Sequence, residues 1–341
     1  MADIQRTTDT PLTPGTITTR AEMMERFGGG PQGGIVPSAT TPNVLIYSDP
    51  ASGEQSGYFD GWLAEEDESG GRIFEYTGHG EEDQTFEGTK GSGNRAILHH
   101  VNDKRALLVF KAAGKARDYP HLGVARTSGT KAQRYVGKFQ LDPKQPYVVR
   151  QAPNRHNVMR RVIVFRMRPV EDLPLNAADV IPPADTTKSI PVPASVTTSA
   201  MVEPETNNHT SSARSAVPKT KAERREAKLT AAFQSFLEKQ QHDVKRFQIK
   251  VKGLSSTLLT DLYDVTAHVL FEAKGTSSRK DIRMAVGQLM DYRRHVHPID
   301  PKLAVLLPDE PHEDLRDLLE SVGIALVYRD GDRFIGWPIV D

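Results

Sequence analysis

The segment "LFEAKG", residues 270–275, places an acid and a lysine two positions apart at the end of an apolar run. In a β-strand, residues two apart point to the same face, so Glu272 and Lys274 lie together while Ala273 points the other way. The solvated face of an edge strand would explain this pattern. A site for a metal ion would also explain it, and the surrounding sequence decides between the two.

The residues before this segment, "TDLYDVTAH" at 260–268, predict that the strand is the second arm of a β-hairpin. If the turn centres between Thr266 and Ala267, Asp261 lies directly across from Glu272, with Cβ atoms ~5 Å apart. Two carboxylates at that distance repel each other unless a positive charge lies between them. A divalent cation with oxygen ligands would satisfy both, which predicts a site for Mg²⁺ or Mn²⁺.

Two further residues belong to this hypothesis. Lys274, on the same face as Glu272, can orient a water molecule beside the metal or help to deprotonate it. Asp264 competes with Asp261 as the first ligand, but the same hairpin register places Asp264 near the turn, opposite Val269. We therefore rank Asp261 above Asp264.

The helix predicted after this strand carries "GQLMDY", in which Gln288 and Tyr292 share one face at i and i+4. An acid, an acid-x-Lys and a Gln-x-x-x-Tyr in this order resemble the PD-(D/E)XK nuclease superfamily and its RecB-like branch, although the proline of that name is absent. The resemblance implies a Mg²⁺-dependent (or Mn²⁺-dependent) endodeoxyribonuclease. The implied catalytic residues are Asp261, Glu272, Lys274, Gln288 and Tyr292.

Three charged residues outside the motif are secondary candidates. Glu226 lies on the apolar stripe of a helix that begins near residue 221, and in this superfamily an acid from that helix sometimes adds a metal ligand; a solvated helix start explains it equally well. Arg279 and Arg283 flank the site and could hold phosphate, or they could be ordinary exposed arginines.

The region around this site predicts an α/β domain over residues 217–341. A helix over 221–241 has an apolar stripe at helical spacing, and strands and helices then alternate to the end of the chain. This order indicates a mixed sheet flanked by helices, which is the restriction-endonuclease-like α/β fold that the resemblance implies.

The N-terminal half has a different pattern. Short β-like runs separated by turn residues indicate a mainly β domain over residues 13–170. They are "NVLIYS", "RIFEYTG", "AILHHV", "ALLVFKAAG", "QRYVGKFQL", "PYVVRQA" and "RRVIVFRMRP". We expect residues 1–12 to be a disordered tail, and 171–216, rich in Pro, Thr, Ser and Ala, to be a linker.

Several stretches of this half resemble the SRA (SET- and RING-associated, or YDG) domain. They are "GGPQGGI" at 29–35, "YTGHG" at 76–80, "DQ" at 83–84, "NRA" at 94–96, "RYVGKF" at 134–139 and "RRVIVFRMRP" at 160–169. The resemblance implies a PUA-like β-barrel that holds a flipped, modified cytosine. The chain as a whole is then an α+β protein of two domains.

An extruded base needs aromatic side chains to stack on and polar groups to bond its edge, and the N-terminal half has candidates for both. Tyr58 and Tyr76 are candidate stacking faces, since an extruded base has lost its neighbours in the duplex. Asp60 can accept a hydrogen bond from the cytosine amino group, and Thr77 can line the space beside the C5 substituent. Gln32 lies where the family projects a loop towards the duplex and could fill the vacated position.

Charge and composition bound the remaining predictions. The 44 basic and 44 acidic residues cancel, so only local clusters indicate a DNA-binding surface. Arg95, Arg150 and Arg161 are the candidate phosphate contacts, the last two from a stretch rich in arginine. The chain has no cysteine, no apolar leader and no long apolar run, so we expect a soluble cytoplasmic protein without a membrane partner.

Together these features predict a modification-dependent, type IV-like DNA restriction endonuclease that defends against foreign DNA. Its partner would be double-stranded DNA carrying modified cytosine, such as 5-methylcytosine. Because one site of this type cuts one strand, we expect a homodimer. A DNA-repair nuclease that senses damaged bases is one alternative, and a non-catalytic protein that binds modified DNA is another.

Overall fold

The computed structural model describes residues 12–49, 51, 53, 59–66, 71–194 and 221–339. The chain divides into two compact units, each described here by itself. The first unit comprises Met1–Asp142 and Ala152–Ile181, and the second comprises Pro143–Gln151 and Pro182–Asp341.

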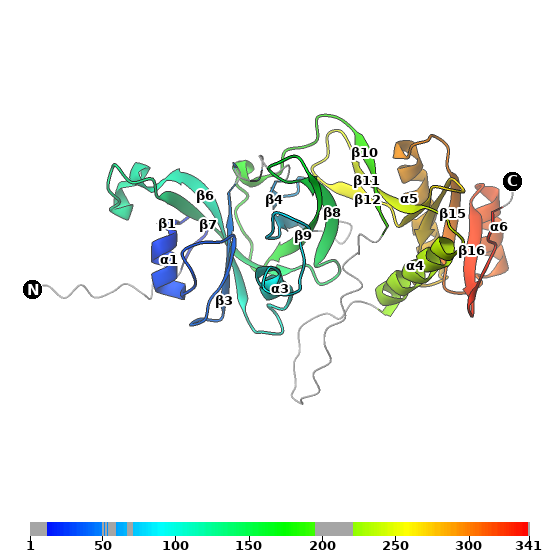
Figure 1. Ribbon diagram of the computed structural model, residues 1–341, viewed down its shortest axis with the longest axis horizontal. Helices are drawn as coiled ribbons and strands as arrows, with labels where there is room; N and C mark the ends of the chain where they lie inside the picture. The colour runs from blue at the N-terminus through cyan, green and yellow to red at the C-terminus, as the bar shows by residue number, and fades with distance from the viewer. Residues whose placement is uncertain are drawn as a thin grey trace, which may run out of the picture. The chain divides into compact units, whose positions relative to one another are not determined.

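The first unit contains eight strands of a nine-stranded mixed sheet (Figure 1), and the ninth, Tyr147–Pro153, lies mostly in the segment Pro143–Gln151 of the second unit. The main path of this sheet runs β2-β3-β6-β7-β9-β5-β4, while β1 pairs with β7 and β8 pairs with β9. The strands are β1 (Ile17–Thr19), β2 (Ile35–Pro37), β3 (Asn43–Ser48), β4 (Gly61–Trp62), β5 (Phe74–Thr77), β6 (Ala106–Lys115), β7 (Lys131–Leu141), β8 (Tyr147–Pro153) and β9 (Met159–Pro169). The helices are α1 (Arg20–Phe27) and α3 (Ser92–Leu98), with 3-10 turns at Ala116–Asp118, Pro120–Leu122 and Ala177–Asp179.

The predicted β-barrel is wrong, because this sheet is open. Among the described residues no ladder joins its end strands, β2 and β4. β4 has two residues, and β2 ends at Pro37, which has no N–H to donate to a further strand. The sheet is also mixed, since β3 and β6 pair in parallel from Asn43↔Ala106 to Ser48↔Lys111.

One of the predicted strands is a helix instead. The run "AILHHV" at 96–101 lies across the end of α3 and the turn after it. Asn94 and Ile97, three residues apart, are both fully buried, so the burial follows a helical period. Short apolar runs do not distinguish a strand from a buried helix by periodicity, which is why the prediction failed here.

The second unit is built on an eight-stranded mixed sheet in the order β10-β11-β13-β14-β15-β16-β17, with β12 paired to β11. The predicted mixed sheet is confirmed. Its strands are β10 (Lys188–Pro193), β11 (Val244–Lys250), β12 (Thr257–Leu259), β13 (Leu262–Asp264), β14 (Val269–Ala273), β15 (Lys302–Leu307), β16 (Ala325–Asp330) and β17 (Arg333–Ile335). Its helices are α4 (Lys221–Lys239), α5 (Arg279–Tyr292), followed by a 3-10 turn at Arg293–His295, and α6 (Glu313–Ser321).

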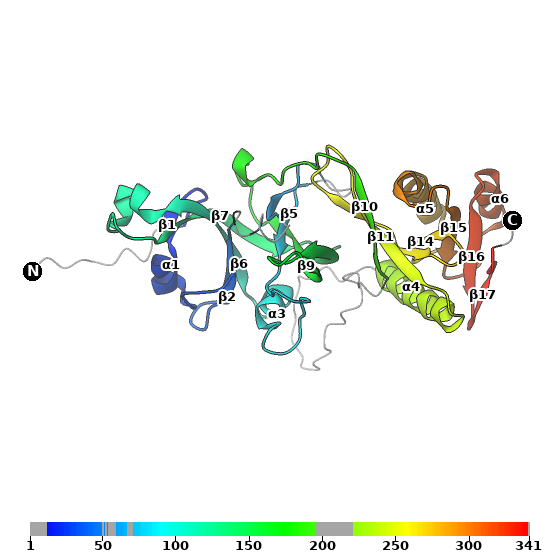
Figure 2. The same ribbon diagram turned by 45° about the horizontal axis from the view of Figure 1, so that its top comes forward.

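Helices cover both faces of this sheet (Figure 2). On one face α4 buries Leu229, Phe233 and Leu237, the stripe that the helical spacing predicts. On the other face α5 and α6 pack through a separate apolar cluster that includes Leu289 and Leu319. The sheet therefore lies between two apolar layers, and polar groups buried in it need partners within the sheet.

The predicted linker, 171–216, is partly built into the two units. Leu173 and Ile181 are buried in the first unit, and Val180 bridges to Trp62. β10 pairs along its whole length with β11, from Lys188↔Lys250 to Pro193↔Lys245. This strand escaped prediction because edge pairing uses backbone groups and buries few apolar side chains; most of its residues are exposed.

No helix in the described parts of the chain is long and apolar enough to cross a membrane.

Candidate functional site

The acidic site of the second unit lies at the hairpin of β13 and β14. The ladder pairs Leu262 with Phe271 and Asp264 with Val269, so the predicted register is confirmed. One step beyond the ladder, Asp261 comes level with Glu272. Its Oδ2 accepts a hydrogen bond of 2.9 Å from the backbone N–H of Ala273. The Asp261 carboxylate is therefore held against the β14 backbone next to Glu272.

Glu272 and Lys274 form a buried ion pair. The Lys274 Nζ lies 2.6 Å from the Glu272 Oε1, and the two residues are 2% and 6% exposed. These exposures exclude the solvated edge strand that the sequence left open. Removing one partner of such a pair leaves a buried charge uncompensated, which costs about 3–5 kcal/mol.

The charges around this pair are unbalanced. Burial raises the pKa of Glu272 well above its ordinary value, Asp261 and Glu226 raise it further, and Lys274 opposes them. Burial lowers the pKa of Lys274, but Glu272, Asp261 and Glu226 outweigh that effect and the net shift is upward. Three carboxylates thus act on one ammonium group, and the site has an excess of negative charge.

This donor set fits a magnesium ion better than a cation with an all-protein cage. Within the described residues, no three or more His, Asp or Glu side chains come together in a way that could hold a metal. Mg²⁺ commonly takes one or two carboxylates and completes its shell with water and substrate phosphate. Asp261 and Glu272 can supply that pair. Glu226 raises the pKa of Glu272 through its charge, and it does not form a cluster of three possible metal ligands with them among the described residues.

Asp264, the competing ligand, is engaged elsewhere. It is fully buried, and its Oδ1 accepts from the backbone N–H of Ala267 at 3.0 Å. Its Oδ2 lies 2.6 Å from the Nδ1 of His242. Oδ1 therefore holds the hairpin turn and Oδ2 contacts the segment between α4 and β11, as expected for a structural residue.

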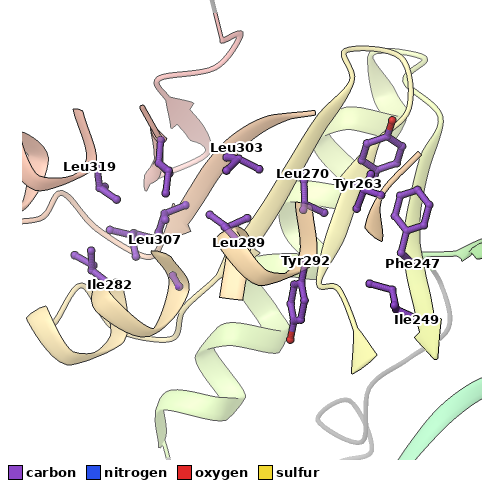
Figure 3. Close-up of a cluster of buried hydrophobic side chains, with 14 of the residues drawn as sticks. Phe247, Ile249, Tyr263, Leu270, Ile282, Leu289, Tyr292, Leu303, Leu307 and Leu319 are labelled. Carbon is purple, nitrogen blue, oxygen red and sulfur yellow. The ribbon is translucent and has the colours of Figure 1, made fainter. Parts of the chain in front are cut away.

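The helical part of the motif lies on α5. Tyr292 is 9% exposed and belongs to the apolar cluster beneath this helix, and its hydroxyl points away from the labelled aliphatic side chains (Figure 3). The Gln288 Oε1 is buried and has no hydrogen-bond partner among the described residues. An unsatisfied buried carbonyl oxygen of this kind is available to a ligand or a water molecule.

Sequence reasoning missed one charged residue of this site, Arg246 on β11. Asp261, Glu272 and Tyr292 all act electrostatically on its buried guanidinium. In the sequence, "KRFQIK" has the pattern of an ordinary strand with a solvated polar face, so nothing local marks Arg246 as buried.

The two predicted phosphate contacts on α5 lie at its surface. Arg283 is exposed, and Arg279 is half exposed and pairs with Asp314. Binding DNA through Arg279 would require that exposed pair to open, which costs little because surface ion pairs contribute about 0–1 kcal/mol.

The central polar group of the first unit is Asp60, just before β4. Its Oδ1 accepts from the backbone N–H of Thr77 at 2.7 Å, and its Oδ2 accepts from the Ser48 hydroxyl at 2.9 Å. Burial raises the pKa of Asp60 to about 6, and the hydrogen bonds from Thr77 and Ser48 and the charge of Lys111 oppose that rise. A carboxylate can accept about four hydrogen bonds, so Asp60 keeps capacity for a further donor.

A pocket of about 560 Å³ is connected to Asp60 through Ser48; Asp60, Tyr76 and Thr77 are not among the residues that line it. Ser48, which donates to Asp60, lines it together with Gln32 of the glycine-rich loop. Arg20 lines it too, with its guanidinium 4.0 Å from the centre of the Tyr47 ring and its Nη1 donating to the Gly33 carbonyl at 2.7 Å. The volume lies within the ~300–1,000 Å³ typical of small-ligand sites.

The aromatic candidates differ from Asp60 in accessibility. Tyr76 is 4% exposed and pairs across the sheet with Phe165. Its hydroxyl lies so close to Gly34 that a Cβ on that glycine would come within 2.9 Å. As described, Tyr76 packs as a core residue, and its stacking role stays a prediction. Tyr58 lies outside the described residues.

Other residues of the resemblance motifs hold the loop after β5. The Gln84 side chain donates to the Gly78 carbonyl at 2.6 Å and accepts from the Ile163 N–H at 2.8 Å. Asn94, fully buried, accepts from the His79 N–H at 2.8 Å. Gln84 and Asn94 therefore stabilise the loop after β5. The "DQ" and "NRA" stretches of the resemblance serve mainly to maintain the fold.

The three arginines predicted to contact phosphate have different surroundings. The Arg95 guanidinium donates to the carbonyls of Phe86 and Gly88 and so braces the loop. Arg150 is partly buried on β8. The Arg161 side chain is 41% exposed, with its Nη2 3.8 Å from Asp83.

Comparison with known proteins found a family match in the N-terminal part of the chain. The family model "ScoMcrA-like, SRA domain" matches residues 14–125, about a third of the chain. The chain therefore carries an SRA domain of the ScoMcrA type in its N-terminal part. No curated protein matches the chain significantly.

Three solved structures are similar, each with a TM-score of 0.33. The sulfur binding domain and SRA domain of ScoMcrA complexed with phosphorothioated DNA is 18% identical and covers 48% of this chain and 41% of that one. KRYPTONITE in complex with mCHG DNA and SAH is 17% identical, over 52% and 36%. The type IV phosphorothioation-dependent restriction endonuclease ScoMcrA is 18% identical, over 48% and 29%. This chain spans less than half the length of each.

Proposed function

We propose that this protein is a modification-dependent DNA endonuclease. Its first unit binds DNA that carries a modified cytosine, and its second unit hydrolyses phosphodiesters at Asp261, Glu272 and Lys274. The observation that carries the proposal is the buried Lys274–Glu272 pair with the Asp261 carboxylate held beside it, in a chain that also has an SRA domain.

In the proposed reaction, Asp261 and Glu272 would hold Mg²⁺, which when bound supplies Lewis-acid stabilisation of the charge that develops on the phosphate. Lys274, fixed by Glu272, orients the attacking water and favours its deprotonated form. Gln288 and Tyr292 approach the same site from α5 and supply hydrogen bonds to the substrate or to water.

In the proposed recognition step, the pocket connected to Asp60 through Ser48 receives the extruded base. Asp60 accepts from the cytosine amino group, since its carboxylate keeps free lone pairs after bonding Thr77 and Ser48. Gln32 lines the same pocket, and its role would be to fill the position that the base leaves in the duplex. Arg161 and its neighbours would contact phosphates.

Digestion of matched duplexes tests the proposal. The duplexes differ only in their modification: unmodified, 5-methylcytosine, 5-hydroxymethylcytosine, glucosylated cytosine and phosphorothioate, each with Mg²⁺ or with EDTA. Cleavage of at least one modified duplex, with Mg²⁺ only, is expected. Binding without cleavage under all conditions would identify a non-catalytic reader. Equal cleavage of the unmodified duplex would contradict the proposal that the first unit recognises modified DNA.

We also propose that two copies act together, because one site of this kind cuts one strand. Sedimentation of the protein with cleavable DNA should show a dimer, and the products should include double-strand breaks. A monomer that yields only nicks would contradict this part of the proposal.

A further inference from the structure

Arg246 is a buried charge that the proposed reaction does not yet use. It lies in the middle of β11, is 4% exposed, and pairs across the sheet with Val192 of β10. A guanidinium is seldom buried without a partner that needs it, because taking the charge out of water costs several kcal/mol. The contacts of Arg246 show what that partner is.

The guanidinium is fixed to the peptide that precedes Asp261. Its Nε donates to the Thr260 carbonyl at 2.8 Å. Thr260 is fully buried, and Phe247 holds it from the same strand through two bonds, Phe247 N–H to Thr260 Oγ1 at 2.8 Å and Thr260 N–H to the Phe247 carbonyl at 3.1 Å. Arg246 and Phe247 together therefore clamp Thr260.

This clamp lies at a break in the sheet. The sequence predicts one strand over 258–265, but the structure has two, β12 ending at Leu259 and β13 beginning at Leu262. Thr260 and Asp261 lie in the gap. A residue in such a gap is released from the ladder, so its direction depends on local contacts rather than on strand pairing. The clamp thus sets the direction of the Asp261 carboxylate.

The charge of Arg246 complements this geometry. Burial lowers its pKa, while Asp261, Glu272 and Tyr292 act in the opposite direction. Arg246 is therefore the second positive charge of a site that otherwise has only Lys274.

We propose that Arg246 is a positioning residue that, by fixing the Thr260 peptide, presents the Asp261 carboxylate to the divalent cation. This inference rests on the proposed function. Lysine cannot replace it, because an ammonium group lacks the planar, rigid set of donors with which the guanidinium holds the Thr260 carbonyl.

Mn²⁺ binding to the full-length protein tests the inference, with electron paramagnetic resonance to count free Mn²⁺. The variants are Arg246→Gln, which removes the charge, and Arg246→Lys, which keeps it. The matched control is Lys245→Met: Lys245 is the neighbouring residue, and its exposed side chain pairs with Asp243. Loss of an outer-shell partner typically weakens metal binding about 10–100-fold, which we expect for both Arg246 variants and not for the control.

The outcomes separate the inference from the proposed function. If the wild-type protein and Lys245→Met bind no Mn²⁺, the proposed metal site fails and the inference falls with it. If the wild-type protein binds and Arg246→Lys binds equally well, only the inference is overturned, even when the thermal midpoint drops. Weakened binding in a folded Arg246→Lys protein, with cleavage restored by excess Mg²⁺, supports the inference.

Discussion

Asp60 in the first unit and Glu272 in the second are both acids whose pKa is raised chiefly by burial. The neighbours of Asp60 oppose that rise, whereas nearby carboxylates add to the rise for Glu272. Asp60 is surrounded by donors: a backbone N–H, a hydroxyl and the charge of Lys111. Glu272 pairs with Lys274 and interacts with the charge of Arg246, but the charges of Asp261 and Glu226 raise its pKa further.

The difference separates a recognition site from a metal site. Donors around a buried carboxylate offset part of the cost of its burial, and the carboxylate can offer its remaining lone pairs to a ligand without needing a cation. A carboxylate beside other carboxylates is only partly compensated, so a divalent cation would stabilise it further. Four experiments test this contrast, from the largest expected effect to the smallest.

Replacing the uncompensated carboxylates should have the largest effect. Glu272→Ala and Asp261→Ala should each lower the cleavage rate by at least about 10³-fold, equivalent to about 4 kcal/mol of transition-state stabilisation. Lys274→Ala should behave alike. Binding to modified DNA, measured by fluorescence anisotropy, should change little, because Asp60 lies in the other unit.

Asp264→Ala is the control for this experiment. Asp264 holds the turn through Ala267 and contacts His242, so its loss should cost about 1–3 kcal/mol of stability but leave cleavage intact below the melting transition. Full loss of cleavage in this folded variant, with Asp261→Ala still active, would show that the ligand assignment is wrong.

The next effect concerns pH and Asp60. With its pKa at about 6 in the folded protein and 3.8 ordinarily, Asp60 keeps its proton in the native state while the unfolded chain has released it. The free energy of unfolding therefore falls as pH rises from about 3.8 to about 6, by a total on the order of 3 kcal/mol. Asp60→Asn removes this titration.

Urea unfolding of the wild-type protein and Asp60→Asn, at about pH 4 and about pH 7, measures the effect. The wild-type protein should lose stability relative to the variant as pH rises, in line with the proton linkage. A difference that stays constant with pH would mean that the donors around Asp60 compensate its burial completely.

The third experiment asks whether Asp60 reads a base. Asp60→Asn keeps the volume but exchanges an acceptor for a donor, so the preference for modified over unmodified duplex should fall by about 1–3 kcal/mol. Paired dissociation constants on the two duplexes provide the measurement. Tyr76→Ala is a poorer test, because emptying that buried position would cost about 3–5 kcal/mol of stability.

Arg161 should give the smallest effect. Its side chain is 41% exposed and only weakly paired with Asp83. Arg161→Ala should weaken binding to modified and unmodified DNA equally and reduce the salt slope of log K by about 1. A change confined to modified DNA would instead place Arg161 at the recognised base.

Local patterns predicted most of the second unit. The hairpin register follows from the turn position, and every side chain then has a defined face, so residue spacing alone was enough to predict the pair Asp264↔Val269. The apolar stripe of α4 followed from helical spacing in the same way. Predictions failed where burial was decided by a distant segment: "AILHHV" formed a helix end, the barrel stayed open, and part of the linker became β10.

The sequence by itself determined the β13–β14 hairpin, the apolar stripe of α4 and the order acid, acid-x-Lys, Gln-x-x-x-Tyr, because these depend on residue spacing within short segments. Only the tertiary structure decided which polar groups are buried and with what charge around them. The alternation that marks a strand is the same for a solvated Arg246 and a buried one. The cross-strand partner Val192 and the Thr260 carbonyl, to which Arg246 donates, both lie outside its own strand, so the strand sequence alone does not show that Arg246 is buried. Desolvation and Coulomb interactions depend on distance in space, and sequence separation does not report that distance.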